Sequence, residues 1–134
     1  MQNIHKEDYL RAMYHLAEEN QEIKSVDVAS YLGVSKASVS EMLKSLDSLG
    51  FLEYRRYARI QLTKKGREAA QNLTARHRII ETFLRDMLKI SERKIHDEAH
   101  NLEHAFSDES ILRLNRLLGN PRLDPHGKPI PKLM

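Results

Sequence analysis

The alternation of apolar and polar positions predicts three short helices in the N-terminal half of the chain. Apolar residues recur every three or four positions across residues 5–19, 26–32 and 36–49, which is the spacing of an amphipathic helix. Gly33 and Gly50 follow the second and third of these segments, where a glycine that tolerates positive φ commonly ends a helix.

Two short strands follow over residues 51–54 and 60–62, on either side of a tight, arginine-rich turn. Three helices and a two-stranded ribbon are the layout of a winged helix. Helical spacing then resumes over residues 64–88, 92–105 and 108–119. We therefore expect a mainly α-helical chain, with an N-terminal winged helix-turn-helix followed by an all-helical part.

Hydroxyl residues stand where five of these helices begin, and their oxygens can accept hydrogen bonds from free backbone N–H groups. The predicted N-caps are Ser25, Ser35, Thr63, Ser91 and Ser107. All four prolines fall within residues 120–134, so we expect an extended tail without a core of its own. The predicted domains are a DNA-binding domain over residues 1–73, a helical domain over residues 74–119, and this tail.

The composition narrows the class of protein. Of the 134 residues, 40% are hydrophobic and 31% are charged, which is typical of a soluble helical protein. No apolar run approaches the roughly 20 residues that span a bilayer, and no signal peptide is recognisable. Cysteine is absent, which excludes disulfides, so we expect a cytoplasmic protein without a membrane partner. The net charge of +3 alone indicates little about binding partners.

Residues 28–40 carry the strongest local motif, a helix-turn-helix. It needs a small residue where its helices touch, a turn residue that tolerates positive φ and an apolar anchor, and Ala29, Gly33 and Val39 supply these. Short hydroxyls and lysines on the second helix suit close approach to phosphates and base edges, as do arginines in the wing. The predicted DNA-contacting residues are Ser35, Lys36, Ala37, Ser38, Ser40, Glu41, Lys44, Arg55, Arg56 and Arg59. An ordinary helical hairpin with a solvated face is the alternative.

Histidines and carboxylates gather on one face of the helix predicted over residues 92–105. His96, His100, Glu103 and His104 stand at i, i+4, i+7 and i+8, so one helical stripe carries all four. Imidazole nitrogens and carboxylate oxygens are the donors that divalent transition metals use. Residues on other helices that could complete the shell are His77, Glu81 and Asp8. A charged, solvated helix face is the alternative interpretation.

Several motifs together resemble the diphtheria toxin repressor family of metal-dependent regulators. The resemblance rests on residues 7–14, the helix-turn-helix, residues 76–78 and residues 96–108, and it extends to about Leu118. It implies a winged-helix domain followed by a helical metal-binding and dimerisation domain, in a homodimer. The tail resembles the linker that leads to an SH3-like third domain in longer members. Because the chain ends at Met134, we expect no such domain.

The resemblance also assigns metal ligands. Its primary site corresponds to Asp8, His100, Glu103 and His104, and its ancillary site to His77, Glu81 and His96, with Arg78 beside it as an anion-contacting residue. Two positions depart from the family pattern. Position 100 is commonly cysteine in iron-responsive members and glutamate in manganese-responsive ones, and here it is His100. Position 11 is a glutamate in the manganese branch, where it serves a paired-metal site, and here it is Arg11.

The expected function is a repressor of metal-uptake genes whose dimer binds a double-stranded DNA operator when activated by metal. We expect Mn²⁺ or Fe²⁺ as the cofactor, with Zn²⁺ or Co²⁺ as alternatives, because the donors are nitrogen and oxygen. A metal held by Asp8 and by the helical ligands would select one orientation of the DNA-reading half. Neither catalysis nor a small organic substrate is expected.

Other readings remain open from the residues alone. The string from His100 to His104 fits the H-x-x-E-H pattern of inverted zinc peptidases, with Glu103 as the general base. A metal-independent winged-helix regulator with a small organic effector, or a simple dimerisation module, are further alternatives. The last helices carry apolar residues that suit either a dimer interface or a core, namely Ile111, Leu112, Leu114, Leu117 and Leu118.

Overall fold

Two compact units make up the chain. The computed structural model describes residues 5–20, 22–55 and 59–134, and the units are Met1–Leu73 and Thr74–Met134. Each unit has a hydrophobic core of its own. In the part of the chain that is described, no helix is both long enough and apolar enough to cross a bilayer.

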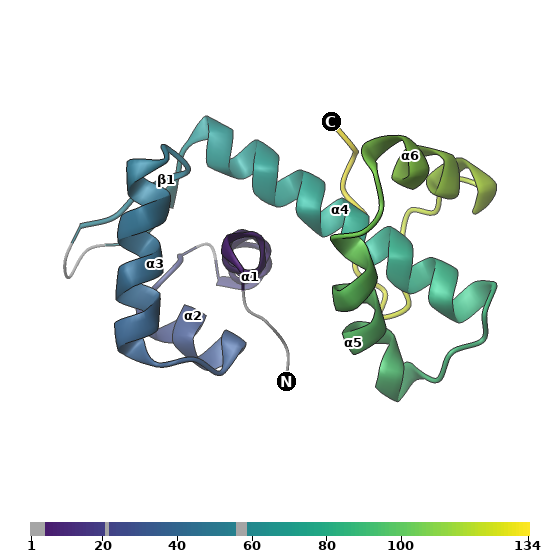
Figure 1. Ribbon diagram of the computed structural model, residues 1–134, viewed down its shortest axis with the longest axis horizontal. Helices are drawn as coiled ribbons and strands as arrows, with labels where there is room; N and C mark the ends of the chain where they lie inside the picture. The colour runs from purple at the N-terminus through teal and green to yellow at the C-terminus, as the bar shows by residue number, and fades with distance from the viewer. Residues whose placement is uncertain (1–4, 21, 56–58) are drawn as a thin grey trace. The chain divides into compact units, whose positions relative to one another are not determined.

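Three helices and a small sheet build the N-terminal unit (Figure 1). They are α1 (Lys6–Asn20), α2 (Ser25–Leu32), α3 (Lys36–Ser48), β1 (Leu52–Glu53) and β2 (Gln61–Leu62). Each of these elements contributes apolar side chains to the core, and Met13, Leu43 and Leu46 are completely buried in it. Complete burial of one such side chain is worth about 1.5–3 kcal/mol. The core therefore fixes α3 against α1 and α2.

Side-chain caps begin three of the helices. Ser35, Thr63 and Ser107 each accept a hydrogen bond from the backbone N–H three residues further along the chain, at 3.0–3.1 Å, so these cap predictions are confirmed. Ser91 occupies the N-cap position of its helix without a side-chain hydrogen bond. Ser25 is already the first residue of α2, and its prediction as a cap is wrong because the helix begins one residue earlier.

The wing is a two-stranded antiparallel ribbon. Leu52 lies opposite Leu62, and both side chains are buried, whereas the neighbouring pair in the ladder is exposed. A further bridge joins Ile60 to Ile23, with the Ile60 N–H donating to the Ile23 carbonyl at 3.1 Å. This bridge ties the segment between α1 and α2 to the wing.

The long helix α4 (Lys64–Asp86) begins where the wing ends, and a glycine makes that junction possible. A Cβ atom placed on Gly66 would lie 1.7 Å from the carbonyl oxygen of Phe51. Thr63 closes the same junction, because its N–H donates to the Phe51 carbonyl at 3.1 Å and its hydroxyl to the Gly50 carbonyl at 2.6 Å. The start of α4 is thus held directly against the backbone that enters β1.

The helical unit consists of the C-terminal part of α4, α5 (Glu92–Glu103), α6 (Asp108–Leu117) and the tail. Its core gathers apolar side chains from the three helices, of which Ile79, Ile95 and Ile111 are at most 1% exposed. On α6, Ile111 and Leu114 are buried, whereas Leu112 and Leu117 are exposed. The sequence could not separate core from interface on α6, and the structure assigns the first pair to the core.

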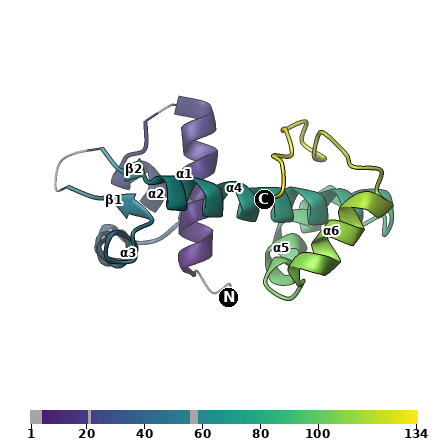
Figure 2. The same ribbon diagram turned by 90° about the horizontal axis from the view of Figure 1, so that it is seen from above.

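The tail folds back onto the helical unit (yellow in Figure 2). The carboxylate of Asp124 accepts hydrogen bonds from the N–H groups of His126 and Lys128, both at 2.8 Å, which closes a turn. Ile130 and Leu133 then pack against the core of this unit. The tail contains no helix, but it contributes apolar side chains to the core.

The mainly helical fold, with a winged helix-turn-helix followed by an all-helical part, is confirmed. The observed α4, α5 and α6 each end two residues before the predicted position, because apolar spacing continues into the turns that follow them. The strands are likewise shorter than predicted.

We predict that Gly66→Ala lowers the melting temperature of the protein. Helix propensity alone would favour alanine by about 1 kcal/mol, whereas the contact with the Phe51 carbonyl forces the start of α4 to shift, at a cost of about 1–3 kcal/mol. Thermal unfolding followed by circular dichroism measures whether the melting temperature rises or falls. Lys64→Ala, at an exposed position of the same turn, is the control. A more stable Gly66→Ala protein would contradict the close approach.

Candidate metal centre and nucleic-acid interface

The helix-turn-helix has the geometry that its motif predicts. Gly33 closes α2 with a φ of 67°, in the left-handed region that favours glycine. Ala29 and Val39, on the two helices that meet at this turn, are buried. Six of the predicted DNA-contacting residues on α3 and at its N-cap are exposed, and Ser40 is half-buried; the six are Ser35, Lys36, Ala37, Ser38, Glu41 and Lys44. The start and outer face of α3 are therefore accessible to a ligand.

Basic residues in and beside the wing divide into two groups. Arg55 and Arg59 are exposed, and Arg59 lies 3.0 Å from Glu22 in a surface ion pair, whereas Arg56 lies outside the described residues. Lys65 and Arg67 are also exposed, but their side chains bind main-chain carbonyl groups. Lys65 donates to the Leu49 carbonyl at 2.8 Å, and Arg67 donates to the Leu62 carbonyl at 3.1 Å. These two cations stabilise the junction between wing and helix.

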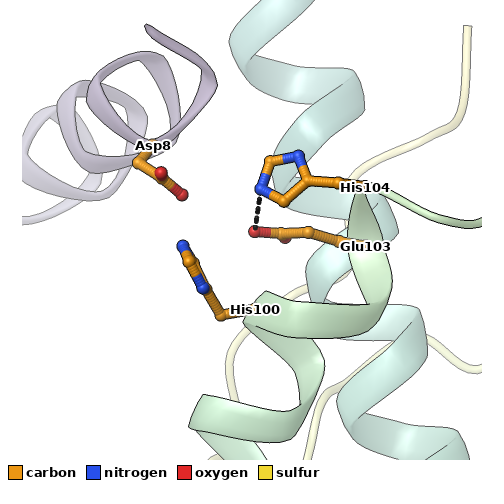
Figure 3. Close-up of side chains that lie close together, drawn as sticks. All are labelled: Asp8, His100, Glu103 and His104. Carbon is orange, nitrogen blue, oxygen red and sulfur yellow. Dashed lines mark ion pairs between the residues drawn. The ribbon is translucent and has the colours of Figure 1, made fainter. Parts of the chain in front are cut away.

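The C-terminal end of α5 carries a compact group of three metal donors (Figure 3). His100, Glu103 and His104 each offer a ligand atom within 4.8 Å of the others, and His104 Nε2 lies 3.7 Å from Glu103 Oε1. His100 and Glu103 are buried, while the His104 side chain is 27% exposed. The carbonyl groups at a helix C-terminus carry partial negative charge, which adds to the attraction for a cation.

Asp8, which Figure 3 also draws, belongs to α1 in the N-terminal unit. Its Oδ2 accepts a hydrogen bond from the backbone N–H of His5 at 2.7 Å, which is one half of a capping box at the start of α1. Its Oδ1 lies 3.6 Å from Nη2 of Arg11. Asp8 therefore helps to begin α1, and within that helix it forms an ion pair with Arg11.

A second group of donors lies between α4 and α5. His77, Glu81 and His96 each offer a ligand atom within 4.8 Å of the others. His77 Nε2 lies 3.5 Å from Glu81 and 3.3 Å from His96 Nδ1. Burial opposes ionisation of Glu81, but the hydrogen bonds and charges of His77 and His96 outweigh it and hold the pKa of this carboxyl well below its ordinary value. Glu81 is thus ionised at neutral pH, as a metal ligand must be.

The tail brings two further donors to Glu81 that the sequence did not single out. Glu81, Asp124 and His126 form another group with ligand atoms within 4.8 Å, and His126 Nδ1 lies 3.9 Å from the Glu81 carboxylate. In the sequence, His126 stands in a proline-rich segment without periodicity. The one local signal was an aspartate and a histidine two residues apart, and it does not indicate an approach to α4.

Arg78 holds this tail in place. Its Nη1 donates to the Pro129 carbonyl at 2.6 Å, and its Nε lies 3.8 Å from the Asp124 carboxylate. The arginine is buried, at 4% exposure. The anion that it contacts in this structure is therefore a carboxylate of the chain itself.

His77 also connects the two groups of donors in the helical unit. Its Nδ1 lies 3.0 Å from Glu103 Oε2, while its Nε2 faces Glu81 and His96. Across both groups the donors are imidazole nitrogens and carboxylate oxygens, with no thiolate. This chemistry fits a divalent first-row ion such as Mn²⁺, Fe²⁺, Co²⁺ or Zn²⁺.

Two protein-family models together match most of the chain. Residues 3–60 match the model described as the iron dependent repressor, N-terminal DNA binding domain, and residues 63–132 match the iron dependent repressor, metal binding and dimerisation domain. The HTH-type transcriptional regulator MntR of Bacillus subtilis is 36% identical over 112 residues, which are 84% of this chain and 78% of its own. An uncharacterized HTH-type transcriptional regulator of Methanocaldococcus jannaschii is 39% identical over 109 residues, 81% of this chain and 87% of its own.

Solved structures of similar proteins share the fold. The manganese regulator SloR is 39% identical with a TM-score of 0.87, and the alignment covers 98% of this chain and 61% of SloR. A manganese-dependent transcriptional repressor in complex with manganese is 36% identical with a TM-score of 0.87, over 96% of this chain and 59% of the other. ScaR with bound Zn²⁺ is 37% identical with a TM-score of 0.80, and the alignment covers 96% of this chain and 60% of ScaR. This chain thus spans about three-fifths of the length of these solved chains. Divalent metal ions are the cofactors of such proteins.

We predict that His126→Ala weakens metal binding at the group around Glu81 by about tenfold, the scale expected when a side chain next to a metal ligand is lost. Competition with a metal chelator measures the affinity. His15→Ala is the matched control, because His15 stacks on Tyr31 in the N-terminal unit with ring centroids 4.7 Å apart. Equal metal affinities in wild type and His126→Ala would exclude the tail from the site.

Proposed function

Because the chain belongs to the family of iron-dependent repressors, which are metal-dependent DNA-binding transcriptional regulators, we propose that it represses metal-uptake genes and binds its operator when loaded with Mn²⁺ or Fe²⁺. The observation that carries the proposal is the presence, in one chain, of an exposed α3 with its wing and of buried nitrogen and oxygen donors on α4 and α5.

We assign two metal sites. The primary set is Asp8, His100, Glu103 and His104, and the ancillary set is His77, Glu81 and His96, to which the tail adds Asp124 and His126. The convergence of His100, Glu103 and His104 at the end of α5 supports the first, and the approach of His77 and His96 to Glu81 supports the second. Asp8 stays in the primary set on its residue type and on the family resemblance alone.

The side chains prepare these sites for a cation. Glu81 and Glu103 are each 4% exposed at the side chain, and His77 faces both of them. A divalent ion held here would neutralise the charge of these buried carboxylates. Histidines bind metal ions through neutral nitrogens, so metal affinity should fall as the pH is lowered and they gain protons.

His100 bears on which ion is used. An imidazole at this position should raise the affinity of the site for Zn²⁺ and Co²⁺ relative to a carboxylate at the same position. We retain Mn²⁺ or Fe²⁺ as the favoured ions because manganese is named for SloR and for the repressor solved with manganese, and iron for the family models. Zn²⁺ and Co²⁺ remain the alternatives.

The partners we propose are a double-stranded DNA operator and a second copy of the chain, in the cytoplasm, with no small organic substrate and no catalytic activity. The exposed Leu112 and Leu117 on α6 support a homodimer, since burial of such side chains against a partner is favourable. In DNA binding, α3 would read base edges in the major groove while the wing arginines contact phosphates.

A second candidate is a regulator with a small organic effector. The N-terminal unit has a hollow of about 350 Å³ beside α3, lined by Tyr9, Val34 and Met42 among others. Operator binding that is indifferent to a metal chelator would favour this candidate over metal activation.

We predict that Asp8→Asn abolishes the response of operator binding to Mn²⁺. The amide oxygen preserves the hydrogen bond from His5 that caps α1, while the negative charge is lost, so metal-dependent DNA affinity should fall at least about tenfold. Gel-shift titrations with and without metal give the readout. Glu109→Gln, an exposed carboxylate on α6, is the control. An unchanged metal response in Asp8→Asn would remove Asp8 from the primary set.

We predict that Lys44→Ala weakens operator binding and lowers the slope of log affinity against log salt concentration by about one, because one phosphate contact is lost. Fluorescence anisotropy at several salt concentrations measures the slope. Lys94→Ala makes the same change of charge on the exposed face of α5 and should leave the slope unaltered. Equal slopes for wild type and Lys44→Ala would contradict a phosphate contact at α3.

A further inference from the structure

Arg76 on α4 makes three hydrogen bonds to the segment that joins α5 to α6. Its Nη2 donates to the carbonyl oxygens of Glu103, at 2.9 Å, and of Phe106, and its Nη1 donates to the carboxylate of Asp108 at 2.9 Å. The Arg76 side chain is 11% exposed. It is not itself among the proposed ligands.

The acceptors show what Arg76 does for the fold. Glu103 is the last residue of α5, Asp108 is the first of α6, and Phe106 lies between them. The last carbonyl groups of a helix have no partner within the helix. At α2 a left-handed glycine provides the closing hydrogen bonds, with Gly33 N–H donating to carbonyls of the last turn. The C-cap of α5 is His104 with a φ of −79°, and a planar guanidinium meets the carbonyls there instead.

Two of the proposed primary ligands, Glu103 and His104, stand at this same helix end. Glu103 is held twice from α4, because Arg76 binds its carbonyl oxygen and the next residue, His77, contacts its carboxylate at 3.0 Å. The Asp108 side chain is 96% exposed, so its ion pair with Arg76 contributes little, and the two carbonyl contacts carry most of the restraint.

We infer that Arg76 is a positioning residue for the primary metal site: it fixes the end of α5 so that Glu103 and His104 point their donor atoms at one ion. The inference rests on the proposed function, because it gives those side chains their role as ligands. The positive charge of Arg76 faces carbonyl oxygens and Asp108, so its contribution is geometric. It acts through the backbone of Glu103 and should affect the α5 group of ligands more than the group around Glu81.

The experiment uses the full chain in a His96→Ala, His126→Ala background. These two substitutions weaken the group around Glu81, so that the measurement reports the α5 group. Arg76→Met or Arg76→Lys is then introduced into this background. Cobalt(II) absorption spectra report the ligand geometry, and chelator competition reports affinity. We expect Arg76→Met to shift the Co²⁺ spectrum and to reduce affinity by about 10–100-fold, as loss of a residue that orients metal ligands commonly does. Arg76→Lys should retain only part of the wild-type affinity, because an ammonium group lacks the planar fork of a guanidinium.

Two further variants separate positioning from general stability. Arg113→Met removes an exposed arginine that pairs with Glu109 on α6 and should leave both spectrum and affinity unchanged. Arg76→Met in a Glu103→Gln background, with His96 and His126 intact, should retain Co²⁺ binding at the group around Glu81 within about twofold. Should Arg76→Met fail to fold, Arg76→Lys, which lacks the planar fork, should still shift the spectrum, and an unchanged spectrum in that variant would overturn the inference. Asp108→Asn, at an exposed ion pair that contributes little, should leave the spectrum unchanged.

An unchanged Co²⁺ spectrum and affinity in folded Arg76→Met, or an equal loss at both groups of donors, would overturn the inference. A wild-type protein that binds no Co²⁺ at all would overturn the proposed function and the inference with it. Normal wild-type binding with an inert Arg76 overturns the inference alone.

Discussion

The helical unit depends on the pairing of charges that its helices bury. The carboxylates of Glu81 and Glu103 are each 4% exposed, and an unpaired buried charge costs several kcal/mol. His77 lies between them, 3.0 Å from Glu103 and 3.5 Å from Glu81, so one imidazole of α4 serves both. The contact with Glu103 also joins α4 to α5. The groups that hold these helices together are therefore the same groups that we assign as metal ligands.

Some arginines and lysines of this chain bind groups within the fold, whereas others are exposed and available to a partner. The net charge therefore indicates little about what the protein binds. Lys65 lies 4.5 Å from the centre of the Phe51 ring, and Arg76 and Arg78 bind carbonyl groups of distant segments. These cations are used within the fold. Lys44 and Arg55 remain exposed on α3 and at the wing. Exposed cations without such a role in the fold are the ones that can contribute to an electrostatic surface for a polyanion.

The sequence predicts those features that depend on residues close together in the chain, and it does not predict contacts between distant residues. Spacing along a helix is a local property, so the stripe of His100, Glu103 and His104 was visible without coordinates, as was the left-handed turn at Gly33. The approach of His126 to Glu81 spans 45 positions of a chain without periodicity there, and no local pattern encodes it. The role of Arg76 is equally non-local, since its partners are main-chain oxygens whose position only the packed helices determine. Family resemblance supplied Asp8, which spacing alone left as one candidate among several.

The order of donors around Glu81 has a consequence for discrimination between ions inside a cell. The histidines lie outermost, with side chains 53% exposed at His96 and 39% at His126, while the carboxylate lies beneath them at 4%. A metal held by this group would be bound by imidazole nitrogens as well as by the buried carboxylate. Mg²⁺ sheds its hydration shell reluctantly and binds oxygen in preference to nitrogen, so it would gain little from the imidazoles. Such a donor set would therefore favour transition-metal ions over this abundant hard cation.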